Sequence, residues 1–169
     1  RVALDAAADA GAETDLIDLG AVGLPLYHPD EDAQGDSEAL RRRVREADGV
    51  LAGTPVYHGS YSSTFKNFHD FCGSDEYAST AVGLLATAGG GSYGGTLEHL
   101  RSTFRNVHAW TVPHEVGIRG ASSKVETGAA APDGRPRIVD DDLRRRTERL
   151  GRVVLEHAER MREYPATDA

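Results

Sequence analysis

The sequence predicts an α/β fold built on a parallel sheet with helices on both faces. Residues 81–87 form an almost continuous apolar run, which is typical of a strand covered on both of its faces. A second apolar run, residues 49–53, precedes it, and segments with apolar residues at helical spacing follow both strands. At 169 residues the chain is long enough to bury a core, and we expect a single domain over residues 1–169.

The first part of the chain alternates between helix and strand. Apolar spacing predicts a helix over residues 2–10, and alternation between glycines predicts a strand over 14–19. A proline-containing loop over 23–30 leads to a helix over 37–47. The strand at 50–54 follows directly.

The alternation continues beyond that strand. We expect a helix over 62–72, the buried strand at 81–87, a glycine-rich loop over 89–95, a helix over 95–105 and a strand over 107–112. This order of elements is that of a parallel sheet with helical crossovers.

The last part of the sequence is less regular. Pro113 ends the preceding strand, and residues 117–140 form a long loop that is either functional or mobile. Apolar residues at helical spacing predict a final helix over 143–161, and residues 165–169 are expected to be a frayed tail.

The composition is acidic, with a net charge of −8, which argues against a nucleic-acid partner. Among the 19 basic residues the only lysines are Lys66 and Lys124. Together with many Asp, Glu and Ala residues, this resembles the surface of a salt-adapted protein, although the codon usage of a GC-rich genome would also favour Arg and Ala.

Nothing in the sequence predicts a membrane segment or a signal peptide. No apolar run approaches the roughly 20 residues that span a bilayer. The single cysteine, Cys72, excludes an intramolecular disulfide and fits a reducing cytoplasm, where we expect the protein. We interpret Cys72 as a buried thiol, because no general base is evident beside it.

The loop after the strand at 50–54 is the first candidate binding site, because ligands bind at the carboxyl ends of parallel strands. Pro55 fixes the backbone, and Tyr57 and Tyr61 offer ring faces to a flat aromatic ligand. Gly59 and Ser60 are expected to leave their amides free to donate hydrogen bonds.

The glycine-rich loop is the second candidate. Gly89, Gly91 and Gly94 fit the pattern G-x-G-x-x-G, and Glu115 lies about 20 residues further on, as in a dinucleotide-binding fingerprint. That fingerprint normally belongs to a first βαβ unit, whereas this loop follows at least two strands.

Both loops are similar to those of one family. The chain resembles the NAD(P)H-dependent FMN reductases of the flavodoxin-like fold, which include flavin, quinone, azo-dye and chromate reductases. The matching positions are Thr54, Pro55, Tyr57, Ser60, Tyr61, Ser62, Lys66, Asn67 and Asp70 in the first loop and helix, and Ala86–Gly95 in the second.

The resemblance implies a doubly wound sheet of five parallel strands in the order 2-1-3-4-5. The first strand and its phosphate-binding loop would lie upstream of Arg1. It also implies FMN bound at the carboxyl edge, with the glycine amides approaching the ring without obstruction by a Cβ. The cofactor-binding residues implied are Pro55, Val56, Tyr57, His58 and Ser60 on one side of the flavin, and Ala88, Gly89, Gly90 and Gly91 on the other.

The implied activity is a ping-pong reaction in which NAD(P)H passes a hydride to FMN, and a flavin, quinone or similar small-molecule acceptor then takes two electrons. The cofactor carries this chemistry, so no side chain is named as catalytic. A homodimer or homotetramer is expected. Lys66 and Asp70 would form either a surface ion pair or part of that interface.

Two other functions stay open at this point. One is a flavodoxin-like electron carrier without NAD(P)H turnover, and the other is a flavin-free binding or regulatory protein. A metal site is not expected, because the seven histidines show no ligand spacing, and His28, His99 and His157 are interpreted as surface or partly buried residues. A serine hydrolase is not expected either, since no G-x-S-x-G motif occurs.

Overall fold

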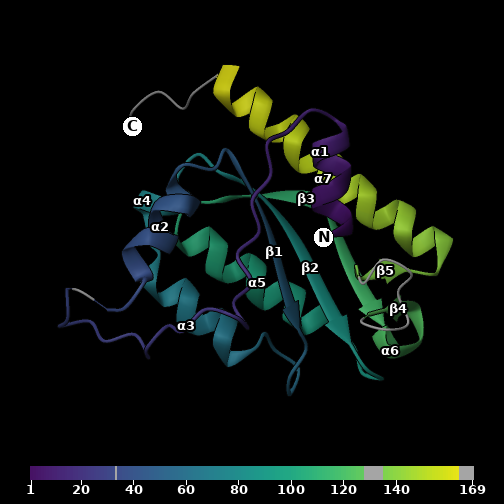
Figure 1. Cartoon of the computed structure of the whole chain (residues 1–169), viewed down its shortest axis with the longest axis horizontal. Helices are drawn as coiled ribbons and strands as arrows, with labels where there is room; N and C mark the ends of the chain where they lie inside the picture. Colours follow the sequence, from purple (N-terminus) through teal and green to yellow (C-terminus); the bar gives the residue numbers. More distant parts are fainter. Residues whose placement is uncertain (33, 128–134, 164–169) are drawn as a thin grey trace.

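The computed structural model describes residues 1–32, 34–127 and 135–163. Its centre is a parallel sheet of β1 (Gly49–Pro55), β2 (Ala81–Ala88) and β3 (Trp110–Arg119), in the order β1-β2-β3 (Figure 1). The prediction of an α/β fold with a parallel sheet is therefore confirmed. The five-strand order is not observed in the part of the chain that the structure describes.

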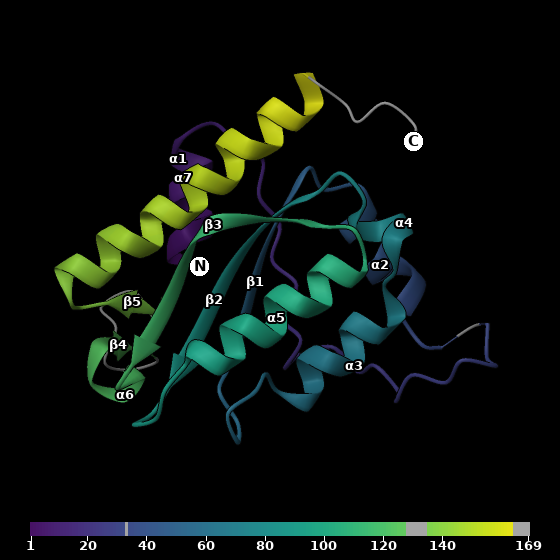
Figure 2. The ribbon, with the colours of Figure 1, turned by 180° about the vertical axis from the view of Figure 1, so that it is seen from behind.

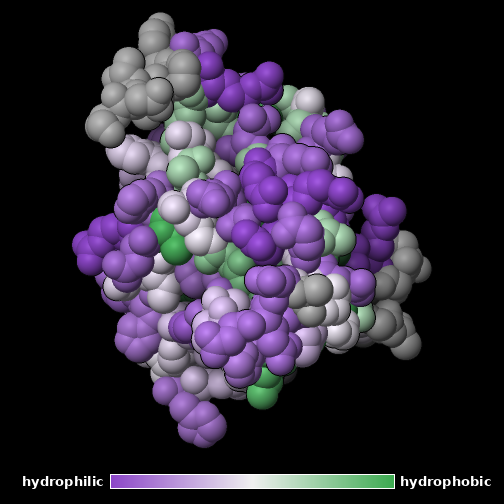
Figure 3. Space-filling model, turned by 90° about the vertical axis from the view of Figure 1, so that its left-hand side faces the viewer, coloured by the Kyte–Doolittle hydropathy of each residue, from purple (hydrophilic) through white to green (hydrophobic). Residues whose placement is uncertain are grey.

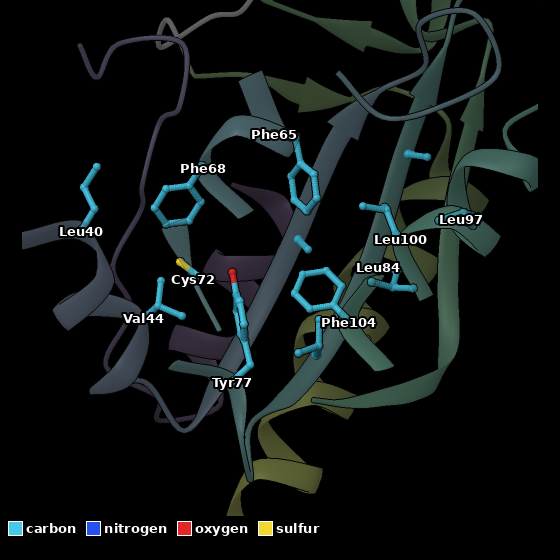
Figure 4. Packing of buried hydrophobic residues seen from close by; sticks show 13 residues of the cluster. Leu40, Val44, Phe65, Phe68, Cys72, Tyr77, Leu84, Leu97, Leu100 and Phe104 are labelled. Atoms are coloured by element: carbon cyan, nitrogen blue, oxygen red, sulfur yellow. The ribbon is translucent and has the colours of Figure 1, made fainter. Parts of the chain in front are cut away.

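Helices cover both faces of this sheet (Figure 2). One face is covered by α3 (Ser63–Phe71) and α5 (Gly94–Asn106), with α2 (Ser37–Arg45) and α4 (Ser74–Tyr77) beside them. Their apolar side chains meet in an aromatic cluster in which the ring of Phe104 is almost completely buried (Figure 4).

The other face is covered by α7 (Asp141–Glu163), on which α1 (Val2–Asp9) packs. Gly83 allows α7 to approach the sheet closely, because a Cβ there would lie 2.6 Å from Val154 Cγ2. Gly151 does the same for α1, since its Cβ would lie 1.9 Å from the carbonyl oxygen of Ala3. Two glycines thus fix the spacing of this layer.

The expected strand at 14–19 is not formed. The segment passes alongside β1 without pairing with it (Figure 1). A cavity of about 1100 Å³ separates the two, lined by residues 14–20 on one side and by β1 on the other. Among the described residues, therefore, no strand lies within hydrogen-bonding reach of the backbone of 14–19.

The strand expected over 107–112 is shifted to Trp110–Arg119 and continues through Pro113. Val82 pairs with Thr111 but Leu84 pairs with Glu115, so the ladder is irregular around the proline. A proline has no N–H to donate, and an irregularity of this kind removes the need for one. Reading Pro113 as the end of the strand was wrong.

Part of the expected loop over 117–140 is ordered structure. It contains α6 (Ala121–Lys124) and an antiparallel pair, β4 (Val125–Glu126) with β5 (Arg137–Ile138). Residues 128–134 of the expected loop and the predicted tail 165–169 lie outside the described residues. No helix among the described residues is long and apolar enough to cross a membrane, and the face in Figure 3 is mostly hydrophilic.

Candidate functional site

The carboxyl ends of the three parallel strands lie at the same edge of the sheet (Figure 1). Pro55 pairs with Thr87 at the end of the β1–β2 ladder, and the amide of Val56 donates to the Thr87 carbonyl at 2.8 Å. The loop after β1 and the glycine-rich loop after β2 therefore begin side by side, as predicted.

A tight turn forms the tip of the first loop. The amide of Tyr57 donates to the carbonyl of Ser60 at 2.9 Å, and the amide of Ser60 donates back to the carbonyl of Tyr57 at 3.0 Å. His58 and Gly59 between them have φ angles of 51° and 79°, the left-handed conformation that such two-residue turns require. The amide of Ser60 is therefore not free, which corrects the prediction.

Two buried hydroxyls fix the base of this loop. Thr54 Oγ1 accepts a hydrogen bond from the amide of Ser62 at 3.0 Å, and Ser62 Oγ accepts one from the amide of Phe65 at 3.1 Å. The second bond caps the N-terminus of α3. Pro55 and Val56 are thus held at the sheet edge, while Tyr57, which is 60% exposed, faces solvent.

The glycine-rich loop is tied to the end of β3. The amide of Gly120 donates to the Gly89 carbonyl at 2.7 Å, and Arg119 Nε donates to the Gly90 carbonyl at 2.9 Å. In a trans peptide group the N–H points in the opposite direction to the C=O, and the peptide bonds here are trans. The amides of Gly90 and Gly91 share their peptide groups with the carbonyls of Gly89 and Gly90. These amides therefore point away from the donors Gly120 and Arg119. Neither amide donates to a backbone carbonyl of the described residues.

The space around this loop fits the edge of a flat ligand. A Cβ at Gly89, Gly90 or Gly91 would meet no atom of the described residues within 4 Å. Open space and outward amides are what an oxygen- and nitrogen-rich ring edge requires. The residues present thus fit the predicted flavin.

His99 is a residue of this edge that sequence reasoning missed. It lies on α5 and is exposed, as expected, but its Nδ1 lies 3.0 Å from Ser60 Oγ, a contact that the sequence did not predict. The contact arises because α5 begins against the turn, where a Cβ at Gly95 would lie 3.4 Å from the Gly59 carbonyl oxygen. Ser60 and His99 are 39 positions apart in the sequence, and no local pattern links them.

Other candidates have structural explanations. Cys72 is buried, and burial raises the pKa of its thiol to about 12, so it stays protonated. Lys66 and Asp70 form the ion pair that was one of their two interpretations. In the part of the chain that the structure describes, no group of three potential ligands is placed to hold a metal ion.

Comparison with known proteins agrees with this geometry. The family model of the NADPH-dependent FMN reductases matches residues 1–123. The chain is 37% identical over 132 residues to an NADPH azoreductase of Bacillus sp. (strain OY1-2), a match that covers 76% of this chain and 72% of the relative. It is 33% identical over 94 residues to an FMN-dependent NADPH-azoreductase of Staphylococcus saprophyticus, covering 56% of this chain and 50% of the relative.

A solved structure shows the same fold. FerB, a flavoenzyme NAD(P)H:(acceptor) oxidoreductase from Paracoccus denitrificans, superposes with a TM-score of 0.73 at 20% identity, over 94% of this chain and 87% of that chain. This likeness confirms the flavodoxin-like α/β architecture. The family predicted from the two loops is confirmed as well, since the matching region contains both of them: the chain belongs to the NADPH-dependent FMN reductases.

Proposed function

We propose that the protein binds FMN between its two loops and catalyses NAD(P)H-dependent reduction of a small-molecule acceptor by a ping-pong mechanism. FMN and NAD(P)H are the cofactor and coenzyme of the family, as the sequence predicted. The observation that carries the proposal is the pair of outward amides at Gly90 and Gly91, opposite a loop held rigid by Thr54 and Ser62.

The chain's own residues would bind and orient the cofactor. The chemistry that FMN supplies is two-electron transfer from NAD(P)H to the acceptor. The amides of Gly90 and Gly91 would donate to one edge of the ring and stabilise negative charge there. Pro55, Val56, Tyr57 and His58 would pack along the other edge, and the contact with His99 would hold Ser60 in the turn.

An azo compound is the acceptor to test first. Both curated relatives described above are named azoreductases that use NADPH. Quinones and free flavins are the next candidates. We also propose a cytoplasmic location and a homodimer or homotetramer, as the sequence suggested.

We further propose that the sheet is completed in the order 2-1-3-4-5. The cavity of about 1100 Å³ is lined by β1 on one side and by residues 14–20 on the other, which leaves a place for one more strand between them. A strand there would pair with the open backbone of β1. Amides of Gly49–Pro55 that face the cavity should then exchange with deuterium much more slowly in a form extended by such a strand than in residues 1–169 alone.

An absorption spectrum of the purified protein, before and after anaerobic addition of NADPH, tests the main proposal. Two flavin bands that bleach promptly, and return when an azo dye is added, are expected. Bands that persist with NADPH and NADH would instead identify an electron carrier. A protein that takes up no FMN would contradict the proposal and favour the flavin-free alternative.

A paired substitution makes this test specific to the site. Gly90→Val places a side chain in the open space beside the loop and should abolish the flavin bands. Gly23→Val is the matched control, because a Cβ there also meets no atom within 4 Å. Retention of FMN by Gly90→Val would show that the ligand lies elsewhere.

A further inference from the structure

We propose that Arg119 binds the 2′-phosphate of NADPH and thereby makes the protein prefer NADPH to NADH. The proposal rests on the proposed function, since it concerns the coenzyme of the same site. It names the residue that distinguishes two coenzymes that differ in one phosphate group.

The first step is the position of Arg119. It is the last residue of β3, at the carboxyl edge of the sheet, and its side chain is exposed. The hydrogen bond from Nε to the carbonyl of Gly90 holds the guanidinium beside the glycine-rich loop. A long side chain that would otherwise be mobile is therefore oriented before any ligand arrives, which lowers the entropic cost of binding.

The second step is the charge of this side chain. No carboxylate of the described residues forms an ion pair with Arg119. By contrast, Arg101 lies 2.5 Å from Glu115, and Arg137 lies 2.7 Å from Glu126. In a chain with a net charge of −8, a cation without a counter-charge is a local attraction for an anion.

The third step is the chemistry of the free donors. With Nε bound to Gly90, the two Nη groups have no hydrogen-bond partner within the described part of the chain. Their planar arrangement matches two oxygens of a phosphate monoester, which arginine binds in a bidentate manner. A phosphate monoester is the group that NADPH has and NADH lacks.

FMN also carries a phosphate monoester, so the ligand has two possible sources. We choose the coenzyme because Arg119 is exposed at the rim, where a molecule that enters and leaves in each cycle is accessible. The two sources make different predictions, since loss of an FMN contact would affect FMN affinity and loss of a coenzyme contact would affect NADPH alone.

Kinetics of three variants test the proposal. Arg119→Gln should lower kcat/KM for NADPH by about tenfold or more, through KM, because it removes charge-assisted hydrogen bonds to the 2′-phosphate. Its kcat/KM for NADH should fall much less, because NADH has no 2′-phosphate and is affected only by the lost bond from Nε to Gly90. Arg119→Lys should keep part of the preference. Arg105→Gln removes the same charge from the far end of α5, where Arg105 is likewise exposed, and should change neither value.

A binding measurement supports the kinetics without needing turnover. Calorimetric titration with adenosine 2′,5′-bisphosphate should show weaker binding to Arg119→Gln than to the parent protein. Titration with adenosine 5′-monophosphate should not distinguish the two proteins. The reference is the parent protein loaded with FMN, whose flavin content is read from its spectrum.

Several outcomes would overturn the assignment. A parent protein without preference for NADPH would do so, as would an equal loss with both coenzymes in Arg119→Gln. Reduced FMN affinity with an intact NADPH preference would assign Arg119 to FMN or to the glycine-rich loop. If the parent protein oxidises neither coenzyme, the proposed function fails. The titration with adenosine 2′,5′-bisphosphate still shows whether Arg119 binds a 2′-phosphate.

Discussion

The ring of Tyr93 occupies the space that a side chain at Gly117 would need. A Cβ at position 117 would lie 2.0 Å from Tyr93 Cδ2. Tyr93 joins the glycine-rich loop to α5, and Gly117 lies in β3. Together with the bonds from Arg119 and Gly120, this contact makes β3 the support of the loop.

Gly117→Ala should therefore displace the loop. The added methyl group forces the Tyr93 ring away, and such overpacking typically lowers the free energy of unfolding by about 1–3 kcal/mol. We also expect FMN affinity to fall about tenfold, since one distorted hydrogen bond at the ring edge accounts for up to that factor. Chemical denaturation and FMN titration measure the two effects.

Gly53→Ala is the control for this experiment, because a Cβ at Gly53 would lie 3.9 Å from its nearest neighbour, Leu85 Cδ2. It should have nearly the stability of the parent protein. Equal FMN affinity in the two variants would show that Tyr93 does not support the site.

Glu76→Gln should destabilise the protein near neutral pH. The Glu76 side chain is 1% exposed and lies 2.9 Å from Arg41 and 3.0 Å from Arg45. Burial alone would raise the pKa of Glu76, but the Gly73 amide and the two guanidinium groups outweigh it and hold this pKa below its usual value. We expect a loss of about 1–3 kcal/mol in the free energy of unfolding, measured by denaturation.

The pH dependence of this loss has a defined sign. A carboxyl whose pKa is lowered by folding stabilises the protein above its unfolded pKa of about 4.3, and this stabilisation disappears as the pH falls through the folded value. The difference in the free energy of unfolding between the parent protein and Glu76→Gln should therefore become smaller in acid. Glu38→Gln is the control: Glu38 also pairs with Arg41 but is 68% exposed, so its removal should have little effect.

His69 should contribute to acid sensitivity nearer neutral pH. Its ring lies between Phe65 and Phe104, with centroid distances of 5.8 and 4.9 Å, and burial lowers its pKa. Because the unfolded state then binds the proton more readily, stability is lost as the pH falls through about 6.5. Between pH 7 and pH 5, the melting temperature of His69→Phe should fall by less than that of the parent protein.

The exposed residue His108 provides the comparison for this measurement. Its φ of 62° lies in the left-handed region, which asparagine tolerates. The melting temperature of His108→Asn should therefore change with pH as that of the parent protein does. If His69→Phe also follows the parent curve, the acid sensitivity has another origin.

Potassium chloride should raise the melting temperature if the acidic composition is a salt adaptation. The net charge of −8 makes the folded chain repel itself, and salt screens that repulsion. Salt also weakens surface pairs such as Arg160–Glu156, so the repulsion must dominate for a gain to appear. Thermal melting at low and high salt decides this, and an unchanged or lower melting temperature favours the codon-usage explanation.

The fold was predictable where one segment determines its own structure. The helices beginning near Ser37, Ser63 and Gly94 and the strands at Gly49 and Ala81 lie within two residues of their expected bounds. Periodicity and local caps are enough for such elements. The segment at 14–19 was not predictable in this way, because alternation shows that a segment can be a strand but not that a partner lies beside it.

The two loops of the candidate site could be predicted from the sequence, but the contacts that hold these loops in place could not. Composition identified both loops at the sheet edge. The contacts that hold them, Ser60 with His99 and Gly90 with Arg119, join residues 39 and 29 positions apart. Only packing brings those pairs together. Arg119 lies in a region that the sequence predicts as a loop, because a proline at position 113 predicts the end of the strand there, whereas β3 continues to Arg119.

The end of α7 lies at the edge of the sheet opposite the candidate site, and this position determines how the protein is best immobilised on a surface or an electrode. Arg162 near its end lies 3.5 Å from Asp48, just before β1, which is the edge of the sheet opposite both loops. Lys124 lies in α6, directly beyond the carboxyl end of β3. Amine-directed coupling at Lys124 would therefore turn the candidate site toward the support, whereas a thiol introduced at the exposed Glu159 of α7 would leave it facing the solution.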